Sequence, residues 1–110
     1  MTALAADAPA RDRTARALDG ADRPLVSVML AQNEIGTLNP VAAIAAAARP
    51  SGALVRAAAG QALGKVPVDL GALGVDLLSV SSHKIGGPPG AGALVLAAGL
   101  DPVPFCLGGG

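Results

Sequence analysis

The chain has 110 residues, with eight basic and eight acidic side chains, one His, one Cys, one Phe and no Trp or Tyr. This length fits one domain or part of one, and a formal net charge of zero with scattered signs excludes the positive surface that nucleic-acid or anionic-membrane binding needs. The apolar fraction is 52%, but Ala makes up much of it, so we expect a thin core.

The sequence gives no sign of secretion or membrane insertion. The first ten residues lack the basic start and apolar stretch of a signal peptide, and Cys106 has no partner for an internal disulfide. The longest apolar run, Val41–Ala48, is far shorter than the roughly 20 residues of a membrane helix. We therefore expect a cytoplasmic protein without a membrane span. Between Phe105 and Leu107, Cys106 is expected to be packed and inert.

The first 24 residues differ in composition from the rest of the chain. They hold most of the Arg and Asp and no long aliphatic run, which predicts a poorly ordered or weakly helical leader with a short helix at Ala15–Leu18. Residues 25–110 carry the apolar segments and form the second predicted unit. Its end, Asp101–Gly110, finishes in three glycines and is typical of a chain cut within a loop.

Apolar segments alternate with helical patterns from Leu25 onward. Four strands are predicted, at Leu25–Ala31, Ala53–Ala57, Leu77–Ser81 and Gly92–Ala97, the last a candidate for an antiparallel direction. Asn39 and Pro40 predict the N-cap and first turn of a helix over Val41–Arg49, and Asp69–Leu73 predicts a helical turn. This order is typical of parallel crossover units. The fold class is therefore α/β, with a partial, mainly parallel mixed sheet of about four strands.

The most informative segment is Ser81–Pro88, which reads SSHKIGGP. It follows the carboxyl end of a predicted parallel strand, where ligand sites of open α/β sheets lie. The two hydroxyls, the imidazole and the ammonium of residues 81–84 can donate hydrogen bonds to a phosphate, and a Lys84 amine that is desolvated or next to another cation can form a Schiff base with an aldehyde. The alternative is a polar loop with a solvated Lys, because any junction between strand and loop can look like this.

Other candidates are weaker. The segment Ala59–Val66 has the spacing of a P-loop, but Ala replaces its first Gly and Val replaces its Ser or Thr, so nucleotide binding rests on a failed motif. Asn33 can point at a ligand across the sheet edge, whereas Glu34 is more simply a solvated side chain. His83 has no second His, Cys pair or acidic cluster at ligand spacing, so no metal site is supported.

Several segments at linked intervals together carry a family resemblance. They are Val26–Met29, Gln32–Gly36, Gln61–Asp69, Asp76–Ser79 and Ser81–Pro88. Together they closely resemble the cysteine desulfurases of the NifS/IscS type, which are class V aminotransferases and pyridoxal 5'-phosphate enzymes of fold type I. The resemblance runs from about Leu25 to Gly110, so residues 25–110 are expected to form part of the cofactor-binding large domain.

The resemblance implies roles for five side chains. Lys84 condenses with the aldehyde of pyridoxal 5'-phosphate, and Ser81 and His83 hydrogen-bond its phosphate. Gln61 contacts the phenolic oxygen of the ring, and Asn33 lies beside that oxygen and the substrate. In the family, this machinery takes sulfur from L-cysteine and leaves alanine and a persulfide on an enzyme Cys.

The sequence also departs from the family. Members usually read His-x-Asp-x-x-Gln along the second strand, where this chain reads RAAAGQ from Arg56 to Gln61, so Ala58 stands where an aspartate pairs with the pyridinium nitrogen. Without that carboxylate the cofactor is a weaker electron sink. The chain is several times shorter than a family member, and Cys106 precedes the region of the catalytic Cys loop. We expect a desulfurase fragment that binds the cofactor weakly and has no turnover alone.

The alternative is a non-catalytic, decayed fragment or an interaction module. The predicted strands are apolar on both faces, but the sequence supplies one good helix and one short turn, so one sheet face is expected to stay exposed. Such a face favours dimerisation or aggregation. Members of the family are homodimers, so the resemblance implies a homodimer as one candidate assembly, although a fragment this short need not reproduce that interface. No nucleic-acid or membrane partner is expected.

Overall fold

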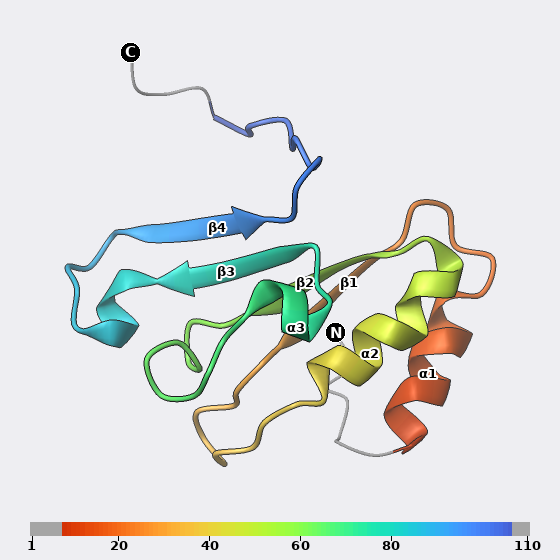
Figure 1. The fold of residues 1–110 in the computed structure, drawn as a ribbon, viewed down its shortest axis with the longest axis horizontal. Coiled ribbons are helices and arrows are strands. Elements are labelled where there is room, and N and C mark those ends of the chain that lie inside the picture. The colour runs from red at the N-terminus through yellow and green to blue at the C-terminus, as the bar shows by residue number, and fades with distance from the viewer. Residues whose placement is uncertain (1–7, 107–110) are drawn as a thin grey trace.

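A computed structural model describes residues 8–106, in which one four-stranded sheet carries helices on a single face (Figure 1). The elements are α1 (Ala8–Leu18), β1 (Leu25–Met29), α2 (Val41–Ala48), the 3-10 helix η1 (Arg49–Ser51), β2 (Leu54–Ala58), α3 (Leu70–Leu73), β3 (Leu77–Ser81), the 3-10 helix η2 (Ser82–Ile85) and β4 (Gly92–Leu96). The strand order is β1-β2-β3-β4, with the first three parallel and β4 antiparallel to β3. The predicted fold class is confirmed. Among the residues described, no helix is long and apolar enough to cross a bilayer.

Strand β1 ends at Met29, two residues before the predicted end at Ala31. The Leu30 N–H still donates to the Ala58 carbonyl at 3.0 Å, but at Ala31 the chain forms an isolated bridge with Leu38 and turns back. Asn39 does not cap α2 as predicted, because its Nδ2 donates to the Met29 carbonyl at 2.7 Å and Pro40 occupies the N-cap position. Asn39 therefore fixes the end of β1 and not the start of the helix.

Helix α1 extends well beyond the short helix expected at Ala15–Leu18. Its buried side chains, Ala10, Thr14 and Leu18, are spaced four residues apart and form the face that packs on α2. The buried Thr14 Oγ1 donates to the Ala10 carbonyl at 2.8 Å, so its hydroxyl is satisfied. Small residues make most of this stripe, which is why the apolar pattern did not reveal it. Residues 1–7 of the expected leader lie outside the described residues.

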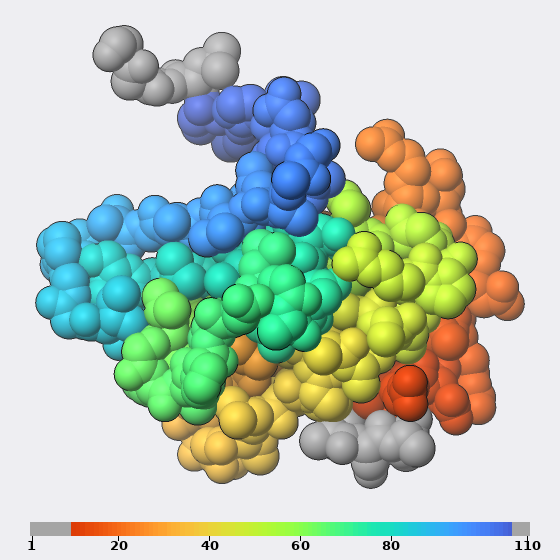
Figure 2. All heavy atoms as spheres, in the orientation of Figure 1, coloured from red at the N-terminus to blue at the C-terminus, as the bar shows by residue number. Residues whose placement is uncertain are grey.

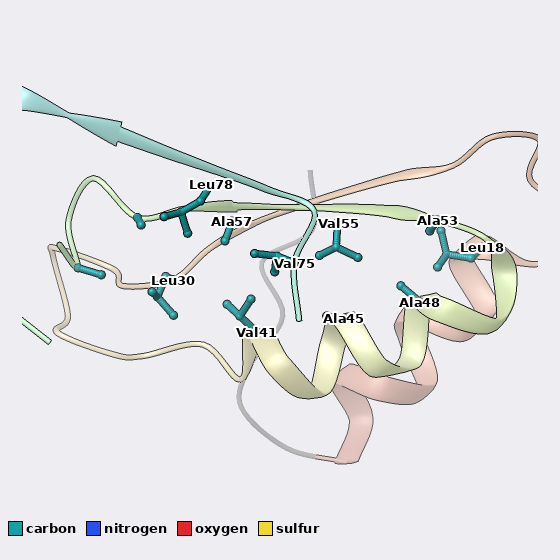
Figure 3. Packing of buried hydrophobic residues seen from close by; sticks show 12 residues of the cluster. Leu18, Leu30, Val41, Ala45, Ala48, Ala53, Val55, Ala57, Val75 and Leu78 are labelled. Atoms are coloured by element: carbon teal, nitrogen blue, oxygen red, sulfur yellow. The ribbon is translucent and has the colours of Figure 1, made fainter. Parts of the chain in front are cut away.

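The core lies between the helices and one face of the sheet (Figure 3). Because side chains alternate along a strand, Val55 and Ala57 face α2 and are fully buried. The largest fully buried side chains are Ile44, Val41, Val55 and Val75. The core is therefore built of small residues, as the composition predicted.

The other face of the sheet carries exposed apolar side chains. Leu25 is 60% exposed and Leu54 is 41% exposed, and these two residues pair in register on β1 and β2. Leu94 on β4 lies on the same face, at 48% exposure, since it pairs with Ser79. In Figure 3, α1 and α2 pack on the opposite face of the sheet, so the expected open face is present in the described part of the chain.

The segment after β4 corrects one expectation. Phe105 and Cys106 are exposed, so Cys106 is not packed as predicted. Figure 2 shows this segment, in blue, projecting away from the body of the molecule, where it meets no apolar surface that would bury it. The three final glycines lie outside the described residues.

Candidate functional site

The carboxyl ends of β1, β2 and β3 lie at one edge of the sheet, and the loops that follow them carry the predicted site residues (Figure 1). Met29 pairs with Ala58, and Ala58 pairs with Ser79, so the three strands end close to the same row. Asn33 lies in the loop after β1 and Gln61 in the turn after β2. The last residue of β3 is Ser81, and His83 and Lys84 follow at once in η2.

The turn after β2 is closed by backbone hydrogen bonds. The Ala59 N–H donates to the Ser79 carbonyl at 2.9 Å, which extends the ladder one residue beyond β2. The N–H groups of Ala62 and Leu63 then both donate to the Ala59 carbonyl at 2.9 Å, so the chain coils and leaves Gln61 half-buried on the turn. A Cβ added at Gly60 would lie 3.5 Å from the Ser81 Oγ, which shows how closely this turn approaches the end of β3.

The turn after β3 rests on the turn after β2. The Ser82 N–H donates to the Ala91 carbonyl at 3.0 Å, and Gly86, at a φ of 85°, ends η2 in the left-handed region that favours glycine. The Cγ2 of Ile85 is 3.3 Å from the position of a Cβ on Gly64. Lys84 therefore stands at the strand ends, with an exposed side chain.

Two hollows lie along this edge. Asn33, Gln61 and Lys65 line one of about 350 Å³, so the structure brings together two of the predicted site residues. Ser81 and Ser82 line another of about 470 Å³. His83 and Lys84 line neither hollow and are exposed on η2. The five residues thus share an edge but do not converge on a single cavity.

The loops at this edge offer unused hydrogen-bond donors. Within residues 8–106, the side chains of Gln61, Ser81, His83 and Lys84 make no hydrogen bond to other protein groups. The loops after the three parallel strands carry two Lys and two carboxylates, Glu34 and Asp69, and Asp69 is engaged in capping α3, where it accepts from the Ala72 N–H at 2.7 Å. In the described part of the chain, no cluster of three His, Cys, Asp or Glu suits a metal ion. This arrangement suits an anion.

The sequence motifs did not indicate two features, one at this edge and one on the open face of the sheet. Lys65 belongs to the hollow that holds Asn33 and Gln61, which only the relative placement of two loops reveals. Arg56, on the open sheet face, donates from Nη1 to the Ser27 Oγ at 2.8 Å and from Nη2 to the Ser79 Oγ at 2.7 Å. A signal for this second feature was present, since alternation puts all three residues on the same face of neighbouring strands.

The Gly87→Ala variant is expected to be less stable by about 1 kcal/mol, because an added Cβ would collide with the Ser82 Oγ and press on the Ser82 Cβ and carbonyl oxygen, both 3.3 Å away. Rotating the Ser82 hydroxyl relieves only the first contact. Gly60→Ala is the matched control, since its Cβ would make an ordinary contact. Urea unfolding of both variants checks this, and equal midpoints would contradict the packing of η2.

Comparison with known proteins gives three consistent matches. The profile of the aminotransferase class-V family matches residues 10–110. An IscS-like cysteine desulfurase of Mycobacterium tuberculosis (strain ATCC 25618 / H37Rv) is 47% identical over 89 residues, which are 81% of this chain and 23% of that protein. A solved NifS-like protein from Rickettsia africae ESF-5 superposes with a TM-score of 0.83 at 31% identity, covering 90% of this chain and 28% of that one. The chain thus spans about a quarter of the length of these relatives.

Proposed function

Because the chain belongs to the class-V aminotransferase family, we propose that it is the part of a cysteine desulfurase large domain that holds pyridoxal 5'-phosphate through Lys84, without turning over L-cysteine alone. The family match, the desulfurase relative and the NifS-like structure confirm the resemblance that the motifs carried. A cytoplasmic setting and a homodimer form part of the same proposal.

The observation that carries this proposal is the position of Lys84, one turn beyond β3 at the carboxyl edge of three parallel strands. Its side chain is exposed, so the amine lacks the desolvation that the sequence-based hypothesis invoked, and the support is the accessibility of this primary amine to an aldehyde. Ser81 and His83, which precede it in the chain, have unused donors within the described residues and suit a phosphate group. These residues therefore fit the aldehyde and the phosphate of the cofactor. Gln61 would contact the phenolic oxygen of the ring, with Asn33 beside it.

The residues do not fit the ring nitrogen. Ala58 ends β2 on the open face, half-buried, and its methyl group cannot accept a hydrogen bond from a protonated ring. When bound, the cofactor supplies an electron sink for a carbanion, and this sink works best when the ring nitrogen is protonated. The chain therefore offers attachment without the partner that supports turnover, and binding without catalysis is the proposed behaviour.

The second candidate function is an interaction module. The observation that favours it is the open sheet face, with Leu25, Leu54 and Leu94 all at least 41% exposed. An apolar sheet face of this kind attracts other protein surfaces. This role needs no cofactor, so cofactor binding by the folded chain distinguishes the two functions.

A titration of the purified chain with pyridoxal 5'-phosphate, followed by the absorbance of the cofactor, tests the first function. The wild-type chain is expected to change the spectrum at a saturable site, and Lys84→Arg is expected to abolish the change, because a guanidinium does not condense with an aldehyde under these conditions. Lys65→Arg, on the neighbouring turn, keeps the positive charge beside Asn33 and Gln61 and removes the other Lys amine, so it is expected to retain a saturable spectral change. Equal loss in both variants, or no binding by the folded wild type, would overturn the proposal and leave the interaction module.

A further inference from the structure

The open face of the sheet carries one charged side chain at its centre. Arg56 lies in the middle of β2, and its two donated hydrogen bonds reach Ser27 on β1 and Ser79 on β3, so the guanidinium spans the three parallel strands. These bonds use two of its five N–H donors. The residue is half-buried, so the charge is held in a fixed place and does not move through solvent.

The register of the sheet shows which way the guanidinium leans. Arg56 pairs with Leu77, whereas Ser79, which accepts from Nη2 at 2.7 Å, pairs with Ala58. The side chain therefore reaches from its own row toward the row of Ala58, nearer the carboxyl edge. Arg56 and Ala58 also share the open face, since they are two residues apart on one strand.

No negative charge balances Arg56 among the residues described. The one ion pair found there joins Arg49 to Asp76, at the amino end of β3. On the loops after the parallel strands, two carboxylates, Glu34 and Asp69, balance the two Lys side chains, and Asp69 is engaged in capping α3. Arg56 is therefore a positive charge without an ion-pair partner on the face that carries Ala58, and a cation placed beside it is disfavoured.

We propose that Arg56 and Ala58 make the ring end of the Lys84 site select a neutral pyridine and exclude a pyridinium cation. The inference rests on the proposed function and adds the protonation state of the bound ligand. Arg56 is then a specificity-determining residue, held in position by Ser27 and Ser79. The site would accept aromatic aldehyde phosphates whose ring position next to Ala58 is uncharged, whether that position holds a nitrogen lone pair or a carbon.

Binding of three ligands tests this inference without any measurement of turnover. They are pyridoxal 5'-phosphate, its analogue with a ring carbon in place of the nitrogen, and its N-methyl analogue, whose ring carries a permanent positive charge. The wild-type chain is expected to bind the first two within about threefold of each other and the N-methyl analogue at least about tenfold more weakly. Equal affinity for all three would overturn the inference while leaving attachment at Lys84 intact. No adduct with pyridoxal 5'-phosphate itself would instead overturn the proposed function.

Two variants test whether the charge of Arg56 causes the weaker binding of the N-methyl analogue. Arg56→Gln keeps hydrogen-bond donors for the serines but removes the charge, so the weaker binding of the N-methyl analogue is expected to disappear. Arg56→Lys keeps the charge and is expected to keep the discrimination. If Arg56→Gln does not fold, Ser79→Ala serves instead, because it releases Nη2 and is expected to reduce the discrimination. If Arg56→Gln discriminates against the N-methyl analogue as strongly as the wild type does, Arg56 does not set this discrimination. Unchanged discrimination in Ser79→Ala would show the same where that variant is used instead.

Discussion

Replacing Asp76 with Ala is expected to lower the free energy of unfolding by about 2–4 kcal/mol. This is the largest loss of stability expected for any of the substitutions considered. Asp76 is 8% exposed, and its Oδ2 accepts from the buried Val55 N–H at 2.8 Å. Its Oδ1 pairs with the Arg49 Nη1 at 3.2 Å. The substitution leaves a buried N–H without an acceptor, at a point where the end of the α2 segment, β2 and β3 meet.

Urea unfolding checks this expectation, with Asp76→Asn and Asp69→Ala as companions. An Asn oxygen can still accept from Val55, so Asp76→Asn is expected to lose about 1 kcal/mol. Asp69→Ala removes an exposed cap of α3 and is expected to lose a similar amount. An Asp76→Ala midpoint equal to that of the wild type would contradict the role of Asp76 in joining these elements.

The second large effect concerns chemistry. The chain saturated with pyridoxal 5'-phosphate is expected to release no alanine from L-cysteine above the level of the Lys84→Arg variant. The physical reason is that, in the proposed site, Ala58 would leave the ring nitrogen without a carboxylate, and the positive charge of Arg56 on the same face would add to this effect. Amino-acid chromatography of the reaction mixture measures this. Alanine formed in proportion to wild-type protein, and absent with Lys84→Arg, would show that the carboxylate is dispensable.

The sheet could be predicted because its signals are local. Apolar runs bounded by Gly, Pro and polar residues gave β3 with its observed bounds, Leu77–Ser81, and the other strands within two residues. Helix α1 was underestimated because its buried stripe uses Ala10 and Thr14, whose burial depends on contact with α2. The predicted role of Asn39 as a helix cap was wrong for a related reason. Only the tertiary structure determines that its side chain binds the Met29 carbonyl and does not cap α2.

The sequence could predict at which edge of the sheet the candidate site residues lie, but not how their side chains are arranged there. The rule that ligand sites follow the carboxyl ends of parallel strands predicted that Asn33, Gln61 and Ser81 lie at one edge of the sheet, and the structure places them there. It did not reveal that Lys65 shares a hollow with Asn33 and Gln61, because that depends on how two loops pack. The exposure of Cys106 was not predicted, because its apolar neighbours in sequence do not show whether the segment packs against the rest of the protein.

Borohydride reduction of the chain with pyridoxal 5'-phosphate, followed by peptide mapping with mass spectrometry, tests the central claim most directly. Reduction fixes the ligand permanently on whichever amine holds it. The expected result is a pyridoxyl group on the peptide that contains Lys84, with Lys65 labelled only at the level found in the unfolded chain. Labelling spread equally over Lys84 and Lys65, or absent from both, would contradict the assignment of Lys84 as the cofactor-holding residue.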